Sequence, residues 1–98
     1  MVDGEKVQKM IQYFNNNKKA MYMVTEVSRH RNSTYSVYKL NALLEDGEIN
    51  FGDDKDVIYH EQYALMGFMV NTIEDIIFED GVVNIMFEFN SIKIELLK

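Results

Sequence analysis

The chain of 98 residues contains no cysteine and no proline. Without cysteine, disulfide bonds, thiolate metal sites and a cysteine nucleophile are excluded, so the fold must depend on packing alone. With no proline and five scattered glycines, no Pro-rich or Gly/Ser-rich linker interrupts the sequence. A single domain over residues 1–98 is therefore expected, because this length and a hydrophobic content of 47% suit one modest core.

Long apolar runs are also missing. No stretch approaches the roughly 18 apolar residues that a membrane helix needs, and no basic start followed by an apolar segment marks a secretion signal. We therefore expect a soluble cytoplasmic protein without a membrane partner. Lysine, asparagine and isoleucine are abundant, a bias typical of AT-rich coding DNA, which favours a bacterial or phage origin.

Signatures of catalysis and of metal or cofactor binding are absent from the sequence. The only histidines are His30 and His60, and Ala64 stands where a zinc-protease motif starting at His60 needs its second histidine. A calcium loop of the EF-hand type starting at Asp46 fails because Phe51 occupies the position that requires glycine. No glycine-rich phosphate loop or nucleophile elbow is present. We predict no catalytic residue, no metal ligand and no cofactor, and we expect a protein that is not an enzyme.

The N-terminal segment has the periodicity of an amphipathic helix. Its apolar stripe at positions i, i+3, i+4 and i+7 is Val7, Met10, Ile11 and Phe14. Asp3 is placed to cap the helix, and the run of asparagines at 15–17 predicts its end in a turn or a left-handed cap.

The next segments have the composition of strands. Residues 21–28 are rich in β-branched and aromatic side chains, and a polar loop over 29–33 follows. Residues 34–45 and 48–51 flank Asp46-Gly47, the dipeptide that a tight hairpin turn favours because both positions need positive φ. A two-residue turn there would place Leu44 opposite Ile49, Ala42 opposite Phe51, and Glu45 opposite Glu48.

The last third predicts a three-stranded meander. Asp80-Gly81 is a second hairpin dipeptide, and it would place Phe78 opposite Val83, Ile76 opposite Ile85, and Glu74 opposite Phe87. A third turn at Asn90-Ser91 would place Phe89 opposite Ile92, Phe87 opposite Ile94, and Ile85 opposite Leu96. In that register all the apolar residues share one face, and Glu88 meets Lys93 on the other.

Residues 57–70 remain open between two interpretations. They fit either a short helix or turn near 55–62 followed by a strand, or a bulged strand over 63–70 with Gly67 at the bulge. With either choice the predicted fold is α+β, with an N-terminal amphipathic helix packed on a curved, mostly antiparallel sheet of five to six strands that ends in the meander.

Charge is distributed unevenly along the chain. Residues 1–40 carry seven basic and three acidic side chains, and residues 41–98 carry three basic and thirteen acidic ones, which gives +4 and −10 and sums to −6. Six of the acids fall in one stretch and form the predicted partner-binding acidic patch: Glu45, Asp46, Glu48, Asp53, Asp54 and Asp56. We expect a small acidic interaction protein, an inhibitor or regulator that blocks a basic, nucleic-acid-binding surface of a partner protein.

Two alternatives remain. Basic and aromatic residues at Lys18, Lys19, Arg29, Arg31 and Tyr35 have the composition of a small nucleic-acid-binding surface, with cations for phosphates and rings for bases. The oppositely charged halves could also pair two copies into a homo-oligomer, with exposed sheet edges adding backbone pairing, and such a charge-driven contact would weaken in salt.

Overall fold

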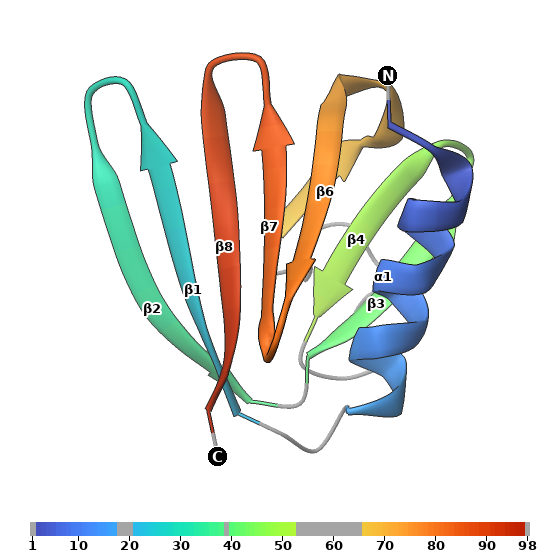
Figure 1. Cartoon of the computed structure of the whole chain (residues 1–98), viewed down its shortest axis with the longest axis horizontal. Helices are drawn as coiled ribbons and strands as arrows, with labels where there is room; N and C mark the ends of the chain where they lie inside the picture. The colour runs from blue at the N-terminus through green and yellow to red at the C-terminus, as the bar shows by residue number, and fades with distance from the viewer. Residues whose placement is uncertain (1, 18–20, 39, 53–65, 98) are drawn as a thin grey trace.

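The computed structural model describes residues 2–17, 21–38, 40–52 and 66–97. Within these ranges the chain forms the helix α1 (Gly4–Asn16), the short 3₁₀ helix η2 (Val70–Thr72) and eight strands: β1 (Met21–Ser28), β2 (Asn32–Tyr38), β3 (Asn41–Glu45), β4 (Glu48–Gly52), β5 (Met66–Met69), β6 (Ile73–Glu79), β7 (Val82–Phe87) and β8 (Asn90–Leu97). Five strands pair antiparallel in the order β2-β1-β8-β7-β6, and three form a second sheet in the order β3-β4-β5 (Figure 1). The predicted α+β class, with a helix packed on an antiparallel sheet, is confirmed.

Helix α1 begins where the sequence predicts. Asp3 is the N-cap, and its Oδ1 accepts a hydrogen bond of 2.9 Å from the backbone N–H of Glu5. The helix ends at Asn16, and Asn17 caps it with φ of −115°, so the left-handed conformation is not used. The side chain of Asn17 instead donates to the carbonyl of Tyr13 at 2.8 Å.

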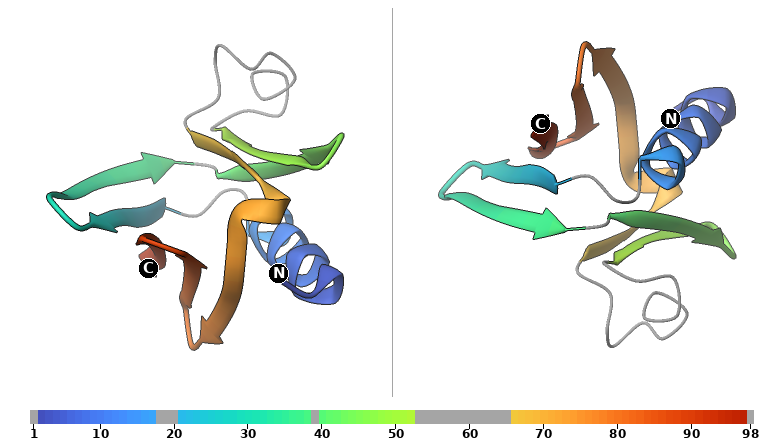
Figure 2. Two further views of the ribbon diagram at one scale, coloured as in Figure 1. Left: turned by 90° about the horizontal axis from the view of Figure 1, so that it is seen from above. Right: turned by 90° about the horizontal axis from the view of Figure 1, so that it is seen from below.

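One core joins the helix to both sheets. The predicted helix stripe supplies Val7, Met10 and Phe14, all buried. The inward faces of the two sheets supply most of the other large, fully buried side chains, including Tyr22, Ile85, Ile94, Ile49 and Phe51. Figure 2 shows the two sheets diverging, with α1 beside β6 on one side and the β3–β4 hairpin on the other. Packing of one helix stripe against two inward faces is what closes a core of this size.

The predicted single strand over 34–45 is wrong. The chain forms β2 and then β3, which belong to different sheets. Leu40, fully buried, lies between them. In β2 the inward side chains are at odd-numbered positions, Tyr35 and Val37, whereas in β3 the buried side chain is at an even-numbered position, Ala42. The alternation of inward and outward side chains is therefore interrupted between the two strands. Such an interruption is what a chain needs to leave one sheet and enter another.

The β3–β4 hairpin has the predicted register. Leu44 lies opposite Ile49, and Ala42 lies opposite Phe51. Asp46 and Gly47 adopt φ of 52° and 77°, as the turn requires.

The β6–β7 hairpin has the predicted pairing near its turn and departs from it further away. At the turn itself Gly81 adopts a φ of 74° but Asp80 does not have positive φ, so the predicted conformation with both residues at positive φ is wrong. Phe78 lies opposite Val83, and Ile76 lies opposite Ile85. A β-bulge between Ile73 and Asp75 then puts Ile73 opposite Phe87, so the predicted pairing of Glu74 with Phe87 is wrong.

The predicted turn at Asn90-Ser91 is also wrong. Ile85 lies opposite Ile92 instead of Leu96, and Lys93 lies opposite Asn84, so the expected pair of Glu88 and Lys93 is not formed. The inward residues of β7 and β8 keep their face because the shift is an even number of residues. Phe89, which was predicted on that face, lies instead in the turn between β7 and β8 and is 75% exposed, so its predicted burial is wrong. Pairing of β8 with β1 over its whole length, which is a long-range contact, accompanies this register.

The question left open for residues 57–70 is partly answered. Met66–Met69 form β5, and Gly67 lies directly opposite Asn50 with no bulge in the pairing. The expected short helix or turn near 55–62 lies outside the described residues. None of the helices that the structure describes has the length and apolar character of a membrane span.

Candidate functional site

The acidic patch predicted from the sequence is described only in part. Glu45 and Glu48 lie opposite each other across the β3–β4 hairpin, as expected. One carboxylate oxygen of Glu48 accepts a hydrogen bond of 2.9 Å from the side chain of Asn50. Asp46 occupies the turn. The remaining members, Asp53, Asp54 and Asp56, lie outside the described residues, so the patch as a whole stays a prediction.

Of the residues of the alternative interface, the structure describes Arg29, Arg31 and Tyr35, and it does not bring the two arginines together with the tyrosine ring. Arg29 and Arg31 are exposed at the turn between β1 and β2, and Lys18 and Lys19 lie outside the described residues. Tyr35 faces the molecule's interior instead, where its hydroxyl lies 3.9 Å from Sδ of Met66. A ring in this position is not available for stacking on a base beside the two arginines.

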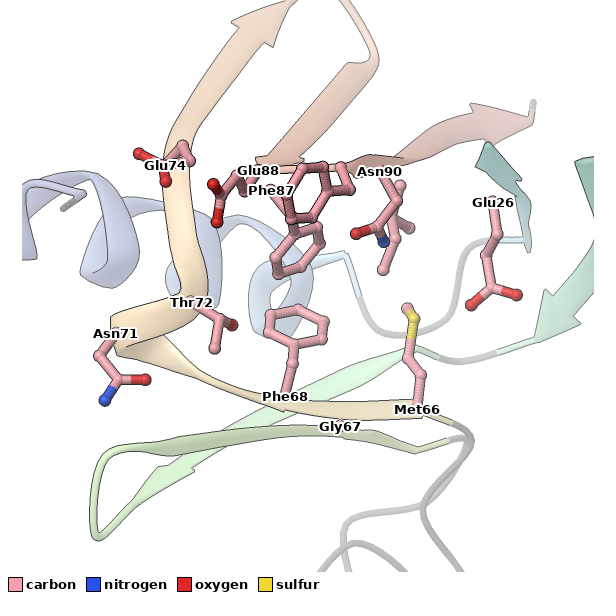
Figure 3. Close-up of a pocket in the computed structure, with 12 residues that line it drawn as sticks. Glu26, Met66, Gly67, Phe68, Asn71, Thr72, Glu74, Phe87, Glu88 and Asn90 are labelled. Carbon is pink, nitrogen blue, oxygen red and sulfur yellow. The ribbon is translucent and has the colours of Figure 1, made fainter. Parts of the chain in front are cut away.

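A cavity of about 620 Å³ lies between the two sheets and is lined by residues from β1, β5, η2, β6, β7, β8 and the turn between β7 and β8 (Figure 3). None of its described lining residues belongs to α1, which packs on the core. We refer to this cavity as the cleft. It was not predicted, because it depends on where two sheets diverge.

Aromatic and thioether side chains form the apolar wall of the cleft. The rings of Phe68 on β5 and Phe87 on β7 meet edge to face, with their centroids 5.1 Å apart and their planes at 80°. Phe68 also contacts the core ring Phe51 at 5.8 Å. Met66 lies on the same wall (Figure 3). These contacts fix the ring of Phe68 between the core and the cavity.

Three glutamates line the same cleft. Figure 3 shows the carboxyl group of Glu26 at one side of the cavity and those of Glu74 and Glu88 at the other. No lysine, arginine or histidine occurs among its described lining residues. The site therefore combines phenyl faces with carboxylates whose negative charge is not balanced by a cationic side chain of the described lining.

Each glutamate reaches the cleft for a local structural reason. Glu26 follows Tyr22 and Val24 on the inward face of β1, where both of its predecessors are fully buried. Glu74 lies at the β-bulge of β6, and Glu88 lies in the turn that follows β7. Alternation along residues 21–28 could have revealed Glu26, since it places a carboxylate on an otherwise apolar face. The other two could not be found, because they depend on the two registers that the sequence did not predict.

The negative charge of the cleft affects a neighbouring phenol. Burial raises the pKa of Tyr35, and the carboxylate of Glu26 raises it further. Both effects disfavour a phenolate here. The Tyr35 hydroxyl therefore remains a neutral hydrogen-bonding group beside the cleft.

Metal binding finds no support in the part of the chain that the structure describes, where no three or more acidic or histidine side chains form a group suited to a cation. Comparison of the chain with protein-family models, with curated proteins and with solved structures found no match. The chemistry of the site is thus argued from the cleft itself. Carboxylates attract cations, and phenyl rings pack on aliphatic stems and bind cations over their faces.

Proposed function

We propose that the protein is a small interaction module whose cleft receives a basic segment of a partner protein. One observation carries the proposal: three glutamates line a cleft whose wall is built from Phe68 and Phe87, with no basic side chain among its described lining residues. The function expected from the sequence is kept, and its site moves from the β3–β4 turn to the cleft.

Arginine and lysine side chains match this combination of groups. Each carries a cationic head on an aliphatic stem, so the head can meet a carboxylate while the stem packs on the rings. The volume of about 620 Å³ falls within the range of about 300–1,000 Å³ typical of ligand sites. Such a site suits one or two side chains of an extended segment.

Binding of this kind would block other uses of the partner's basic surface. Where that surface normally holds nucleic acid, occupation by the acidic protein would compete with the phosphates by charge complementarity. An inhibitor or regulator acting by steric and electrostatic blockade is therefore the biological role that we propose.

The test uses a nine-residue peptide alternating arginine and leucine, and a control peptide with neutral citrulline in place of arginine. Isothermal titration calorimetry measures both dissociation constants, and NMR amide shifts locate the binding site. We expect the arginine peptide to shift amides around Phe68, Phe87 and Glu26, and the citrulline peptide to bind at least about tenfold more weakly, a difference of about 1.4 kcal/mol.

Two triple variants make the comparison specific. Glu26→Gln/Glu74→Gln/Glu88→Gln removes the carboxylates of the cleft, and Glu5→Gln/Glu79→Gln/Glu95→Gln removes the same amount of charge elsewhere. We expect at least about tenfold weaker binding for the first and less than about threefold for the second, since none of the three control residues lines the cleft. Equal affinities of the two variants, or equal binding of the two peptides, would contradict the proposal.

The nucleic-acid alternative is tested on the same samples. A gel shift with a labelled single-stranded oligonucleotide at low and moderate salt would support it if binding is lost in Arg29→Ala/Arg31→Ala. Under the cleft proposal, no shift is expected from the wild-type protein, because its net charge of −6 opposes phosphates.

A further inference from the structure

Strand β2 forms one edge of the five-stranded sheet (Figure 1). The backbone N–H of Ser28 donates to the carbonyl of Arg31 at 2.9 Å, which closes the hairpin between β1 and β2. Because hydrogen-bonded residues alternate along an antiparallel pair, β2 uses the backbone of Ser33, Tyr35 and Val37 for pairing with β1. The N–H and C=O groups of Asn32, Thr34 and Ser36 therefore point away from the sheet, and all three residues are exposed.

The edge at β3 is closed by a helix side chain. Asn15 of α1 donates from Nδ2 to the carbonyl of Ala42 at 3.1 Å, and its Oδ1 accepts from the N–H of Ala42 at 2.9 Å. The side-chain amide thus takes the place of one residue of a neighbouring strand. No further strand can pair at Ala42 while this contact holds.

The edge at β6 is closed by the N-terminal segment and by the strand's own side chains. Val2 donates its N–H to the carbonyl of Ile73 at 3.1 Å. The outward N–H of Ile76 donates to the carboxylate of Asp75 at 2.8 Å, and Lys6 of α1 binds the same carboxylate at 2.6 Å. Charge, a bulge and a covering element protect this edge, all of them devices that prevent edge pairing.

The edge at β5 is short. The strand has four residues, and the hydroxyl of Thr72 donates to the carbonyl of Met69 at 2.6 Å. Little outward backbone remains here for another strand.

Strand β2 has none of these protections among the described residues. Its seven residues are Asn32-Ser33-Thr34-Tyr35-Ser36-Val37-Tyr38, without charge, proline or bulge. Among the described edge strands, it alone combines this length with a neutral sequence. Natural proteins rarely leave such an edge open, because it is a template for pairing with another strand.

We propose that two copies of this chain pair antiparallel along their β2 edges, which would join two five-stranded sheets into one of ten strands. An identical strand is the occupant that fits best. Antiparallel self-pairing is isologous and stops at two copies, and a neutral strand opposes no like charges within the contact. A basic segment of the kind that suits the cleft would gain nothing from neutral β2. The contact uses no residue of the cleft and stands independently of the proposed function.

The test combines mass and hydrogen exchange. Sedimentation equilibrium up to about 1 mM protein is expected to show twice the mass of one chain, with dissociation on dilution, because an edge contact is smaller than a standard interface. In the dimer, amide exchange is expected to slow at Asn32, Thr34 and Ser36, and this protection should fall on dilution. Ser33, Tyr35 and Val37 should stay protected at every concentration, since they bond to β1.

Thr34→Pro is the blocking variant. Its N–H points outward, so proline removes a donor needed for self-pairing while the hydrogen bonds between β1 and β2 remain. Ser36→Lys is a second blocking variant, because lysine at an edge opposes pairing by charge. Ser91→Lys, on central strand β8, is the control and should remain dimeric.

The expected outcome is a dimer that persists in 0.5 M NaCl and becomes monomeric in both blocking variants. A monomer at 1 mM with fast exchange at Thr34 would overturn the proposal, as would a dimer that tolerates both blocking substitutions. Dissociation of the dimer in salt would also overturn it, because that result indicates contact between oppositely charged surfaces.

Discussion

Asn50 on β4 lies directly opposite Gly67 on β5, and a Cβ atom added to Gly67 would be 2.3 Å from Oδ1 of Asn50. The glycine serves a close approach between strands and not a bulge. Asn50 is 9% exposed, and its side chain is held by Glu48 at 2.9 Å. The added methyl group therefore meets a side chain that cannot move without losing a hydrogen bond.

Gly67→Ala is expected to lower the free energy of unfolding by about 1–2 kcal/mol, because displacing Asn50 leaves a buried polar group without its partner. Urea denaturation measures the change. In an Asn50→Ala background the same substitution should cost less than about 0.5 kcal/mol, since the obstructing amide is gone. Equal costs in both backgrounds would show that the two residues are not coupled.

Asn15 provides a second prediction, because one side chain satisfies both backbone groups of Ala42. Asn15→Ala should lower the free energy of unfolding by about 1–2 kcal/mol relative to Asn16→Ala, the matched control. Both substitutions improve helix propensity equally, and only the first removes the bonds to β3. Amide exchange at Ala42 should accelerate in Asn15→Ala alone. Identical urea midpoints for the two variants would contradict a stabilising role for the hydrogen bonds between Asn15 and the backbone of Ala42.

The ion pair between Lys6 and Asp75 predicts a dependence on acid pH. The carboxylate of Asp75 accepts hydrogen bonds from Nζ of Lys6 and from the N–H of Ile76, and these bonds lower the pKa of Asp75 from its ordinary value of 3.8. A lowered pKa in the folded state means that the stabilisation is present above pH 3.8 and is lost as the pH falls through the folded value. Lys6→Met should therefore be less stable than wild type at neutral pH, and the difference should disappear in acid.

NMR titration of the Asp75 carboxyl carbon checks the cause directly, since its pKa should rise in Lys6→Met. Lys93→Met is the control, because Lys93 is exposed on β8 and forms no ion pair among the described residues. An unchanged pKa of Asp75 in Lys6→Met would contradict the assignment.

The turns whose position was predicted correctly share one physical property. Asp46-Gly47 and Asp80-Gly81 both place glycine at positive φ, a requirement that few sequences meet, so local chemistry fixes the register. Asn90-Ser91 imposes no such requirement. An even shift leaves the inward face of β8 unchanged, so its register depends on the distant strand β1, which no local pattern reports.

The candidate site follows the same division. The position of Glu26 could have been predicted from the sequence, because alternation with Tyr22 and Val24 assigns it to the inward face of β1. Glu74 and Glu88 were not, since a bulge and a turn bring them to the cleft. The charge bias of the C-terminal part was a correct observation, but side-chain direction depends on register and not on composition.

Tyr13 of α1 carries a buried hydroxyl with no hydrogen-bond partner among the described residues. Burial raises the pKa of Tyr13, and the carboxylate of Asp80 raises it further. Because a buried, unpaired hydroxyl costs about 1–3 kcal/mol, we expect Tyr13→Phe to raise the free energy of unfolding by about 1 kcal/mol.

Tyr22→Phe is the matched control. Its hydroxyl donates to the carbonyl of Asn17 at 3.1 Å, so this change should lower the same quantity by about 1 kcal/mol. Urea denaturation of both variants gives the comparison, and a loss of stability in Tyr13→Phe would show that its hydroxyl has a partner after all.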